Sequence, residues 1–249
     1  MNNSKDYISK KKFFDSMLTI YGRNPVVEAL EDNSLKIHKL HLADSNRDID
    51  VITKIKKLAN SRDIEIAYHN KTALSRISKN AKQDQGVALD IIMPHSSSEE
   101  NFLEENQEFR VLALNSIQNP QNLGMIIRSC VAGNIDAIII EDKNSAKISP
   151  LVIKASAGTM FKIPIIKSKN LVKTLKNFDN TDIYTLSSHS KYSYKDENYQ
   201  KRVIFILGNE SDGVSKEIEN ISTKSIAIPM NRGVESLNVA VTASILAFL

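Results

Sequence analysis

The order of apolar and polar positions predicts two runs of alternating helices and strands. In the first run, apolar residues recur at helical spacing in two segments and follow strand-like patterns in three others. The predicted helices are 21–30 and 49–58, and the predicted strands are 37–42, 64–68 and 86–93. Asn24 followed by Pro25 is typical of a helix start, with Asn24 as the N-cap residue. These elements make a small α/β domain.

The second run alternates more regularly. Its predicted strands are mostly short, continuous apolar runs, as in a sheet that is covered on both faces. The strands lie at 110–114, 137–140, 163–166, 183–187, 203–207 and 226–228, and the helices at 121–132, 149–158, 169–178, 214–220 and 237–249. This alternation predicts an α/β fold with a mainly parallel six-stranded sheet and helices on both faces.

The segment between the two runs marks a domain boundary. Residues 93–109 read MPHSSSEENFLEENQEF, in which one proline, three serines and five glutamates interrupt the apolar periodicity. Such a composition is typical of a linker. The predicted organisation is a basic N-terminal arm (1–20), a first domain (21–93), an acidic linker (94–108) and a second domain (109–249).

The composition excludes several classes of protein. Of the 249 residues, 41% are apolar, which is enough for a packed core, and no apolar run approaches the length of a membrane span. The basic N-terminus has no continuous apolar stretch, so we expect no secretory signal. A single cysteine, Cys130, excludes an internal disulfide framework, and the five scattered histidines show no metal-ligand spacing. We expect a cytoplasmic protein without a metal site or a membrane contact.

The net charge of +4 is unevenly distributed. Residues 1–92 carry 16 Lys and Arg against 12 Asp and Glu, and residues 109–249 carry 17 basic against 12 acidic residues. The charged residues of 93–108 are five Glu, with no Lys or Arg. Two basic blocks therefore flank one acidic connector. Charge alone leaves two interpretations equally open, an ordinary solvated surface and a polyanionic partner such as nucleic acid.

Three segments that follow predicted strands are rich in glycine and polar residues: 115–124, 208–213 and 228–238. They contain four of the eight glycines of the chain, which indicates close backbone approach or positive φ angles. The carboxyl ends of parallel strands are also where ligands bind in open sheets. Each segment taken singly has a simpler explanation, because Asn, Ser, Asp and Gly are ordinary turn and cap residues.

Arg128 is harder to explain as a turn or cap residue. It lies in an otherwise apolar helix, LGMIIRSCVAG, and we expect a buried guanidinium, which requires an anionic partner. The usual nucleotide-binding patterns are absent, since the chain has neither a G-x-G nor a G-x-x-x-x-G-K-[ST] motif.

The three strand-end segments together resemble the motifs of a known family. NPQNLGMIIRS, VIFILGNESDGVS and IPMNRGVESLNVAVTASI are similar, in order and spacing, to the three motifs of the SpoU (TrmH-like) RNA ribose 2′-O-methyltransferases. The front part, from YGRNPVVEAL to DQGVALDI, resembles the ribosomal-protein-L30e-like domain that is fused to many members. The combination looks most like the 23S rRNA guanosine-2′-O-methyltransferase branch.

The resemblance implies a fold, a cofactor and a set of site residues. It implies an L30e-like RNA substrate-binding domain over 21–93 and a SPOUT-type catalytic domain over 109–249 with a deep C-terminal trefoil knot. It also implies S-adenosyl-L-methionine as cofactor and a homodimer whose active site uses both subunits. By position, the catalytic residues are Asn122, Arg128, Glu210, Ser236 and Asn238, the cofactor-binding residues are Gly208, Ile228, Met230 and Leu237, and the RNA-binding residues are Arg128, Arg232 and Arg23.

Within this resemblance Arg128 is interpreted as a phosphate clamp and electrostatic activator of the ribose hydroxyl, and other members are proposed to use the same arginine for activation. Asn115 and Asn119 stand where many relatives have Asp, which removes negative charge near Arg128. The favoured substrate is a guanosine in 23S rRNA, and the alternatives are a tRNA ribose or an adenosine in rRNA modified by a resistance-type enzyme. A non-catalytic ribosome-assembly factor is the alternative from a different class.

Overall fold

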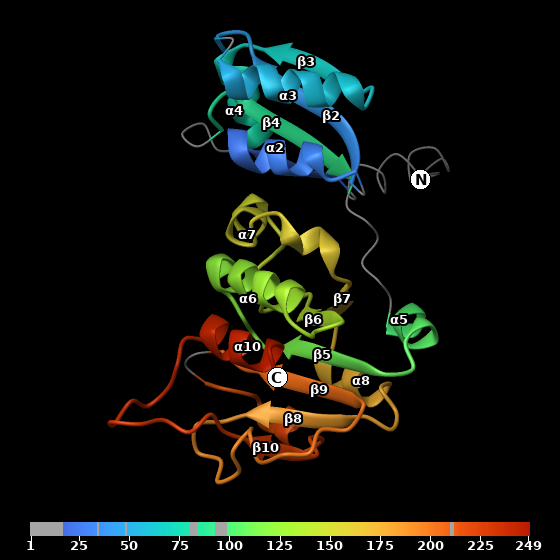
Figure 1. Ribbon diagram of the computed structural model, residues 1–249, viewed down its shortest axis with the longest axis vertical. Helices are drawn as coiled ribbons and strands as arrows, with labels where there is room; N and C mark the ends of the chain where they lie inside the picture. The colour runs from blue at the N-terminus through green and yellow to red at the C-terminus, as the bar shows by residue number, and fades with distance from the viewer. Residues whose placement is uncertain (1–16, 34, 48, 80–83, 93–98, 210–211) are drawn as a thin grey trace, which may run out of the picture. The chain divides into compact units, whose positions relative to one another are not determined.

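The computed structural model describes residues 17–33, 35–47, 49–79, 84–92, 99–209 and 212–249 (Figure 1). The chain divides into two compact units, Met1–His95 and Ser96–Leu249. Each unit has its own sheet and its own core. In the described residues no helix combines the length and the apolar character that a membrane crossing requires.

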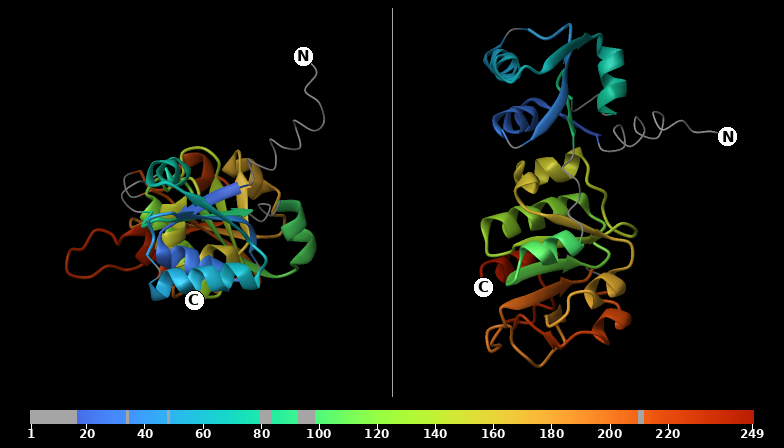
Figure 2. Two further views of the ribbon diagram at one scale, coloured as in Figure 1. Left: turned by 90° about the horizontal axis from the view of Figure 1, so that it is seen from above. Right: turned by 90° about the vertical axis from the view of Figure 1, so that its right-hand side faces the viewer.

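The first unit is a four-stranded mixed sheet with helices on both faces. Its elements are β1 (Met17–Tyr21), α2 (Arg23–Glu31), β2 (Lys36–Ala43), α3 (Asp50–Ser61), β3 (Glu65–His69), α4 (Lys71–Ser78) and β4 (Val87–Ile92). The strand order is β1-β4-β2-β3, with β2 and β3 parallel and β4 antiparallel to both of its neighbours. Helices α2 and α3 pack together on one face and α4 lies on the other (Figure 2, right).

Three features of this unit differ from the prediction. Strand β1 and helix α4 were not predicted, and residues 17–20 belong to the sheet rather than to an N-terminal arm. The first helix begins at Arg23, with Gly22 as its N-cap instead of Asn24. Gly22 has φ 92° and ψ 149°, a conformation that only glycine adopts without strain. It ends β1 and lets the helix begin directly after it, before the predicted cap residue Asn24.

The second unit is a fully parallel six-stranded sheet, as predicted. Its strands are β5 (Phe109–Leu114), β6 (Ala137–Glu141), β7 (Ile165–Ser168), β8 (Asp182–Leu186), β9 (Arg202–Leu207) and β10 (Lys224–Ile226), in the order β10-β8-β9-β5-β6-β7. Its helices are α5 (Glu99–Glu105), α6 (Pro120–Ala132), α7 (Pro150–Ala155), the 3₁₀ helix η1 (Thr159–Lys162), α8 (Leu171–Lys176), α9 (Lys216–Glu219) and α10 (Val239–Ala247). Helices α5, α8 and α9 contribute to a core cluster on one face, and α6 and α10 pack together on the other (Figure 1).

The acidic segment expected to be a linker contains helix α5. Phe102 of this helix is 2% exposed and packs against the rings of Phe109 and Phe178, with centroid distances of 5.5 and 6.4 Å. The glutamates suit a solvated helix because Glu has a high helix propensity. The buried ring of Phe102 therefore packs α5 against the core of the second unit, although the composition of this segment alone is typical of a linker. Smaller shifts occur at β7, which begins at Ile165, and at β10, which ends at Ile226.

Helix α6 lies between α7 and α10 and is held close to both. A Cβ atom at Gly124 would overlap Ala155 of α7, and one at Gly133 would overlap the backbone of Ala247 in α10. The hydroxyl groups of Ser129 and Ser244 share a hydrogen bond of 2.7 Å between α6 and α10. Small residues thus let the C-terminal helix lie directly on the helix that follows β5.

Candidate active site

The three glycine-rich segments follow strands β5, β9 and β10 at the carboxyl edge of the parallel sheet. Strands β5 and β9 are direct neighbours, with Leu114 paired to Leu207 at this edge. The amide oxygen of Asn115 accepts a hydrogen bond of 3.0 Å from the backbone N–H of Ser215, which ties the loop after β5 to the loop after β9. Parallel pairing therefore brings segments about 100 residues apart to one place.

Asn122 and Asn238 connect the first segment to the third. The side-chain amide of Asn238 donates to Oδ1 of Asn122 at 3.3 Å, although the residues are 116 positions apart. Asn238 is the N-cap of α10, since its Oδ1 accepts from the N–H of Ala240 at 2.9 Å. Asn122 is 7% exposed in the first turn of α6. The structure thus brings together two of the five predicted catalytic residues from opposite ends of the second unit.

Arg128 differs from its predicted environment. It lies on α6, but its side chain is exposed in this chain, so the expectation of a buried guanidinium is wrong. The cause is the orientation of the helix: the buried face presents Leu123, Ile126 and Ile127, whereas Arg128 lies on the same outward face as Met125, which is 43% exposed. An exposed guanidinium is available to an external anion.

The loop after β9 approaches itself so closely that only glycine fits at its start. A Cβ atom at Gly208 would overlap the backbone carbonyl group of Gly213, and the N–H of Gly213 donates to the carbonyl oxygen of Asn209 at 3.1 Å. The side-chain amide of Asn209 donates a hydrogen bond of 3.1 Å to Oδ2 of Asp212. The predicted catalytic residue Glu210 lies outside the described residues.

The segment after β10 places its predicted residues in two environments. The predicted cofactor residues Ile228, Met230 and Leu237 are half-buried, whereas residues 231–236, with Ser236 and Arg232 among them, are exposed in this chain. Arg232 (φ 58°) and Gly233 (φ 74°) are consecutive left-handed residues, which turn the chain back toward α10. The polar cluster of this motif is therefore not buried within this chain.

Arg23, the remaining predicted residue, lies in the first unit at the start of α2. Within the described residues, no group of three His, Cys, Asp or Glu side chains is arranged to hold a metal ion. Burial raises the pKa of the Cys130 thiol to about 12, so this thiol is not a nucleophile at neutral pH.

Glu141 contacts the first of the three segments and was not singled out by the sequence analysis. It ends β6, and its Oε2 accepts from the N–H of Ser116 at 2.7 Å and from the side-chain amide of Asn115 at 3.2 Å. A carboxylate therefore stands beside Asn115. The signal in the sequence was the acidic residue that directly follows the apolar run AIII.

We expect a double variant that swaps the amide of Asn115 and the carboxylate of Glu141 to be more active than either single variant. Glu141→Gln should lower catalytic activity about tenfold, because a hydrogen bond to a carboxylate contributes about 1.5–3 kcal/mol. Asn115→Asp should be worse, because two carboxylates would then face each other. The double variant Asn115→Asp/Glu141→Gln should recover activity toward the wild-type value, as a steady-state assay of all four proteins would show. A double variant no better than the worse single variant would contradict a shared role.

Comparison with known proteins identifies the second unit. Residues 110–248, more than half of the chain, match the family model described as the SpoU rRNA methylase family. The chain belongs to this family. Residues 19–97 match a second model, described as RNA 2′-O ribose methyltransferase substrate binding.

Individual relatives agree with this family assignment. An uncharacterized tRNA/rRNA methyltransferase of Borreliella burgdorferi is 33% identical over 208 residues, which cover 78% of this chain and 90% of the relative. A protein of Xanthomonas campestris named 23S rRNA (guanosine-2′-O-)-methyltransferase RlmB is 28% identical over 92% of this chain and 94% of its own length. The crystal structure of the SpoU methyltransferase AviRb from Streptomyces viridochromogenes, 18% identical, superposes with a TM-score of 0.79 and shares the fold over 98% of this chain and 91% of its own.

Proposed function

We propose that this protein transfers a methyl group from S-adenosyl-L-methionine to the ribose 2′-hydroxyl of a guanosine in 23S rRNA. The observation that carries the proposal is the hydrogen bond between Asn122 and Asn238, which joins the first and third SpoU motifs. The relatives named for 23S rRNA guanosine 2′-O-methylation support the choice of substrate. The substrate-binding model over residues 19–97 supports a ribose hydroxyl as acceptor.

Arg128 is assigned to a substrate phosphate. Its side chain is exposed, and a guanidinium forms two parallel hydrogen bonds to phosphate oxygens. Because a guanidinium stays protonated at physiological pH, Arg128 acts as a clamp and an electrostatic activator, not as a base. Asn122 and Asn238 then hold the ribose in line for transfer, which is where positioning contributes most. Glu210 and Ser236 are proposed to complete the site.

The cofactor is assigned to the loops after β9 and β10. Among the described residues, the backbone groups of Ile228, Met230 and Leu237 form no hydrogen bond with the rest of the backbone, and free backbone donors and acceptors suit an adenosine group. Gly208 adds a close backbone approach at the neighbouring strand end. The residues present therefore fit S-adenosyl-L-methionine, which supplies an electrophilic methyl group on its sulfonium.

We also propose the finer features of the family for this chain: an L30e-like first unit, a deep trefoil knot formed by the C-terminal segment, and a homodimer. The dimer rests on exposed apolar side chains: Met125 on α6 near Arg128, Val241 on α10 and Phe248 directly after α10, which are 43%, 47% and 63% exposed. A second copy would cover them and bring polar residues to the exposed segment 231–236. Sedimentation equilibrium measures the mass, and a monomer at micromolar concentration would contradict this part.

The deciding experiment is methyl transfer from tritiated S-adenosyl-L-methionine to RNA. Ribosomal RNA isolated from a strain that lacks the gene should accept label, and the same RNA from the wild-type strain should accept little. Mapping of alkali-resistant 2′-O-methyl positions should then find one guanosine in 23S rRNA. Label in tRNA or in an rRNA adenosine would correct the substrate, and binding of RNA without any transfer would refute the enzyme.

We expect Asn238→Ala and Asn238→Asp to separate the two roles of Asn238. Both variants should lose at least tenfold in methyl transfer, because neither can donate to Asn122. Only the alanine variant should lose stability, by about 1 kcal/mol, because aspartate still caps α10. Chemical denaturation and single-turnover kinetics measure the two effects. An unchanged rate in both variants would remove Asn238 from the site.

A further inference from the structure

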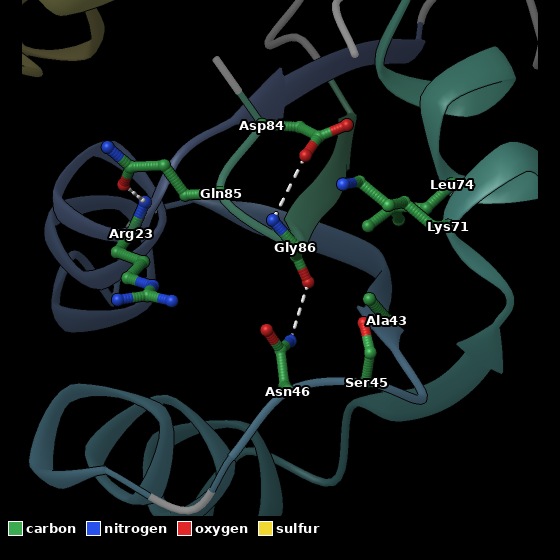
Figure 3. Close-up of a pocket in the computed structure, with 9 residues that line it drawn as sticks. All are labelled: Arg23, Ala43, Ser45, Asn46, Lys71, Leu74, Asp84, Gln85 and Gly86. Atoms are coloured by element: carbon green, nitrogen blue, oxygen red, sulfur yellow. Dashed lines mark hydrogen bonds between the residues drawn. The ribbon is translucent and has the colours of Figure 1, made fainter. Parts of the chain in front are cut away.

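The first unit contains a hollow at the edge where β1, β2 and β3 end and β4 begins. It has a volume of about 460 Å³ and is lined by Arg23, Ala43, Ser45, Asn46, Lys71, Leu74, Asp84, Gln85 and Gly86 (Figure 3). The residues come from four separate connections, so the hollow is a product of the fold and not of one loop. Its size lies in the range of small-ligand sites.

Two cations that have no ion-pair partner among the described residues line the hollow. Arg23 and Lys71 are the first residues of α2 and α4, and neither forms an ion pair with any described residue. Figure 3 shows them on opposite sides of the Gly86 backbone. The Nε atom of Arg23 is shielded from solvent, and no described group accepts a hydrogen bond from it. Such a donor is costly unless a ligand supplies the acceptor.

Among the described residues of the lining, Asp84 supplies the one carboxylate, and the protein already engages it. Asp84 is 7% exposed, and its oxygens accept from the hydroxyl of Ser78 and from the N–H of Gly86, both at 3.0 Å. Its charge is therefore partly compensated, while those of Arg23 and Lys71 are not. The start of a helix also favours anions, because its first N–H groups point outward.

The polar groups between the cations are held in place. The side-chain oxygen of Gln85 accepts from the N–H of Arg23 at 3.1 Å, and the amide of Asn46 donates to the carbonyl oxygen of Gly86 at 2.7 Å. Gly86 has φ 78°, and a Cβ atom there would overlap Asn46, so this approach requires glycine. Gln85 and Asn46 each use one end of their amide for these contacts, and Ser45 stands beside them with an exposed hydroxyl.

We infer that this hollow binds one unpaired nucleotide of the RNA substrate, with Arg23 and Lys71 on adjacent phosphates and the amides of Gln85 and Asn46 facing the nucleotide between them. This inference rests on the proposed function, because it takes RNA as the substrate. It adds a second anchoring point, in the first unit, that is separate from the phosphate assigned to Arg128. Single-stranded nucleotides are the parts of RNA whose base edges protein side chains can reach.

The test compares RNA binding by full-length variants. Arg23→Gln/Lys71→Gln should weaken binding of a fluorescein-labelled single-stranded RNA decamer and of ribosomal RNA from the deletion strain at least tenfold. The salt dependence, d log K/d log[salt], should become shallower by about 1.4, as expected for two lost phosphate contacts on single strands. With ribosomal RNA, KM should rise and kcat should stay unchanged, because the chemistry lies in the other unit.

Matched controls remove the same charge elsewhere on the unit. Lys57→Gln on α3 and Arg76→Gln on α4 change exposed cations outside the hollow and should alter affinity less than twofold. Ser45→Trp fills the hollow without changing charge and should weaken binding, whereas Asn60→Trp, on the exposed surface of α3, should not. Equal losses in the controls, or unchanged binding in the double variant and in Ser45→Trp, would overturn the inference. A wild-type protein that binds no RNA would instead refute the proposed function itself.

Discussion

Arg128→Ala is expected to lower kcat for methyl transfer by about 10²–10³-fold, the usual cost of removing one group that stabilises charge in a transition state. The side chain is exposed on α6, so its removal leaves no cavity and the free energy of unfolding should change by less than about 0.5 kcal/mol. Affinity for S-adenosyl-L-methionine should also persist, since the cofactor is assigned to the loops after β9 and β10. Single-turnover kinetics, calorimetric titration of the cofactor and thermal unfolding measure the three quantities.

Two other arginine variants distinguish charge from geometry. Arg128→Lys keeps the charge but loses the paired hydrogen bonds to phosphate, so its rate should lie between those of the wild type and the alanine variant. Arg232→Ala removes an exposed arginine from the third motif and should raise KM for RNA while kcat stays within a few fold. Wild-type turnover by Arg128→Ala at saturating RNA would remove Arg128 from the chemistry.

The architecture of the second unit was largely predictable because its strands are continuous apolar runs. VIFIL and AIII are buried along almost their whole length, as both covered faces of a parallel sheet require. Strand β1 was not predictable in the same way. Its five residues, Met17–Tyr21, form a strand only by antiparallel pairing with β4 more than 65 residues later. Local patterning does not encode such a partner.

Site residues that lie in the family motifs could be predicted from the sequence. The burial of a side chain could not be predicted where it depends on which other surface covers the helix. The resemblance assigned Asn122 and Asn238 to one catalytic set, and the structure joins them by a hydrogen bond that was not predicted; their catalytic role stays a prediction. The exposure of Arg128 was missed because an apolar helix can be buried by its own subunit or by another protein. Met125 beside it shows that part of the apolar surface of α6 is not covered within this chain. Glu141 was missed because its contacts depend on Asn115, which directly follows the neighbouring strand β5.

Gly208→Ala is expected to have the largest effect on the cofactor site. The atoms that a Cβ would meet belong to the backbone of Gly213 and Val214, which cannot rotate away as a side chain could. The loop after β9 must therefore move. We expect a loss of about 3 kcal/mol in the free energy of unfolding, the upper part of the usual range for overpacking. Affinity for S-adenosyl-L-methionine should fall at least tenfold, as calorimetric titration would measure.

Gly213→Ala, at the other end of the same loop, separates steric overlap from backbone strain. Gly213 has φ 67°, so alanine costs about 1–2 kcal/mol there, but among the described residues beyond its chain neighbours no atom lies within 4 Å of the added Cβ. Its cofactor affinity should change less than about fivefold, because the path of the loop is preserved. If the close approach at Gly208 shapes the cofactor site, Gly208→Ala must lower cofactor affinity much more than Gly213→Ala does, whereas the two variants should differ less in the free energy of unfolding. Equal affinities for the cofactor in both variants would mean that the loop after β9 does not form that site.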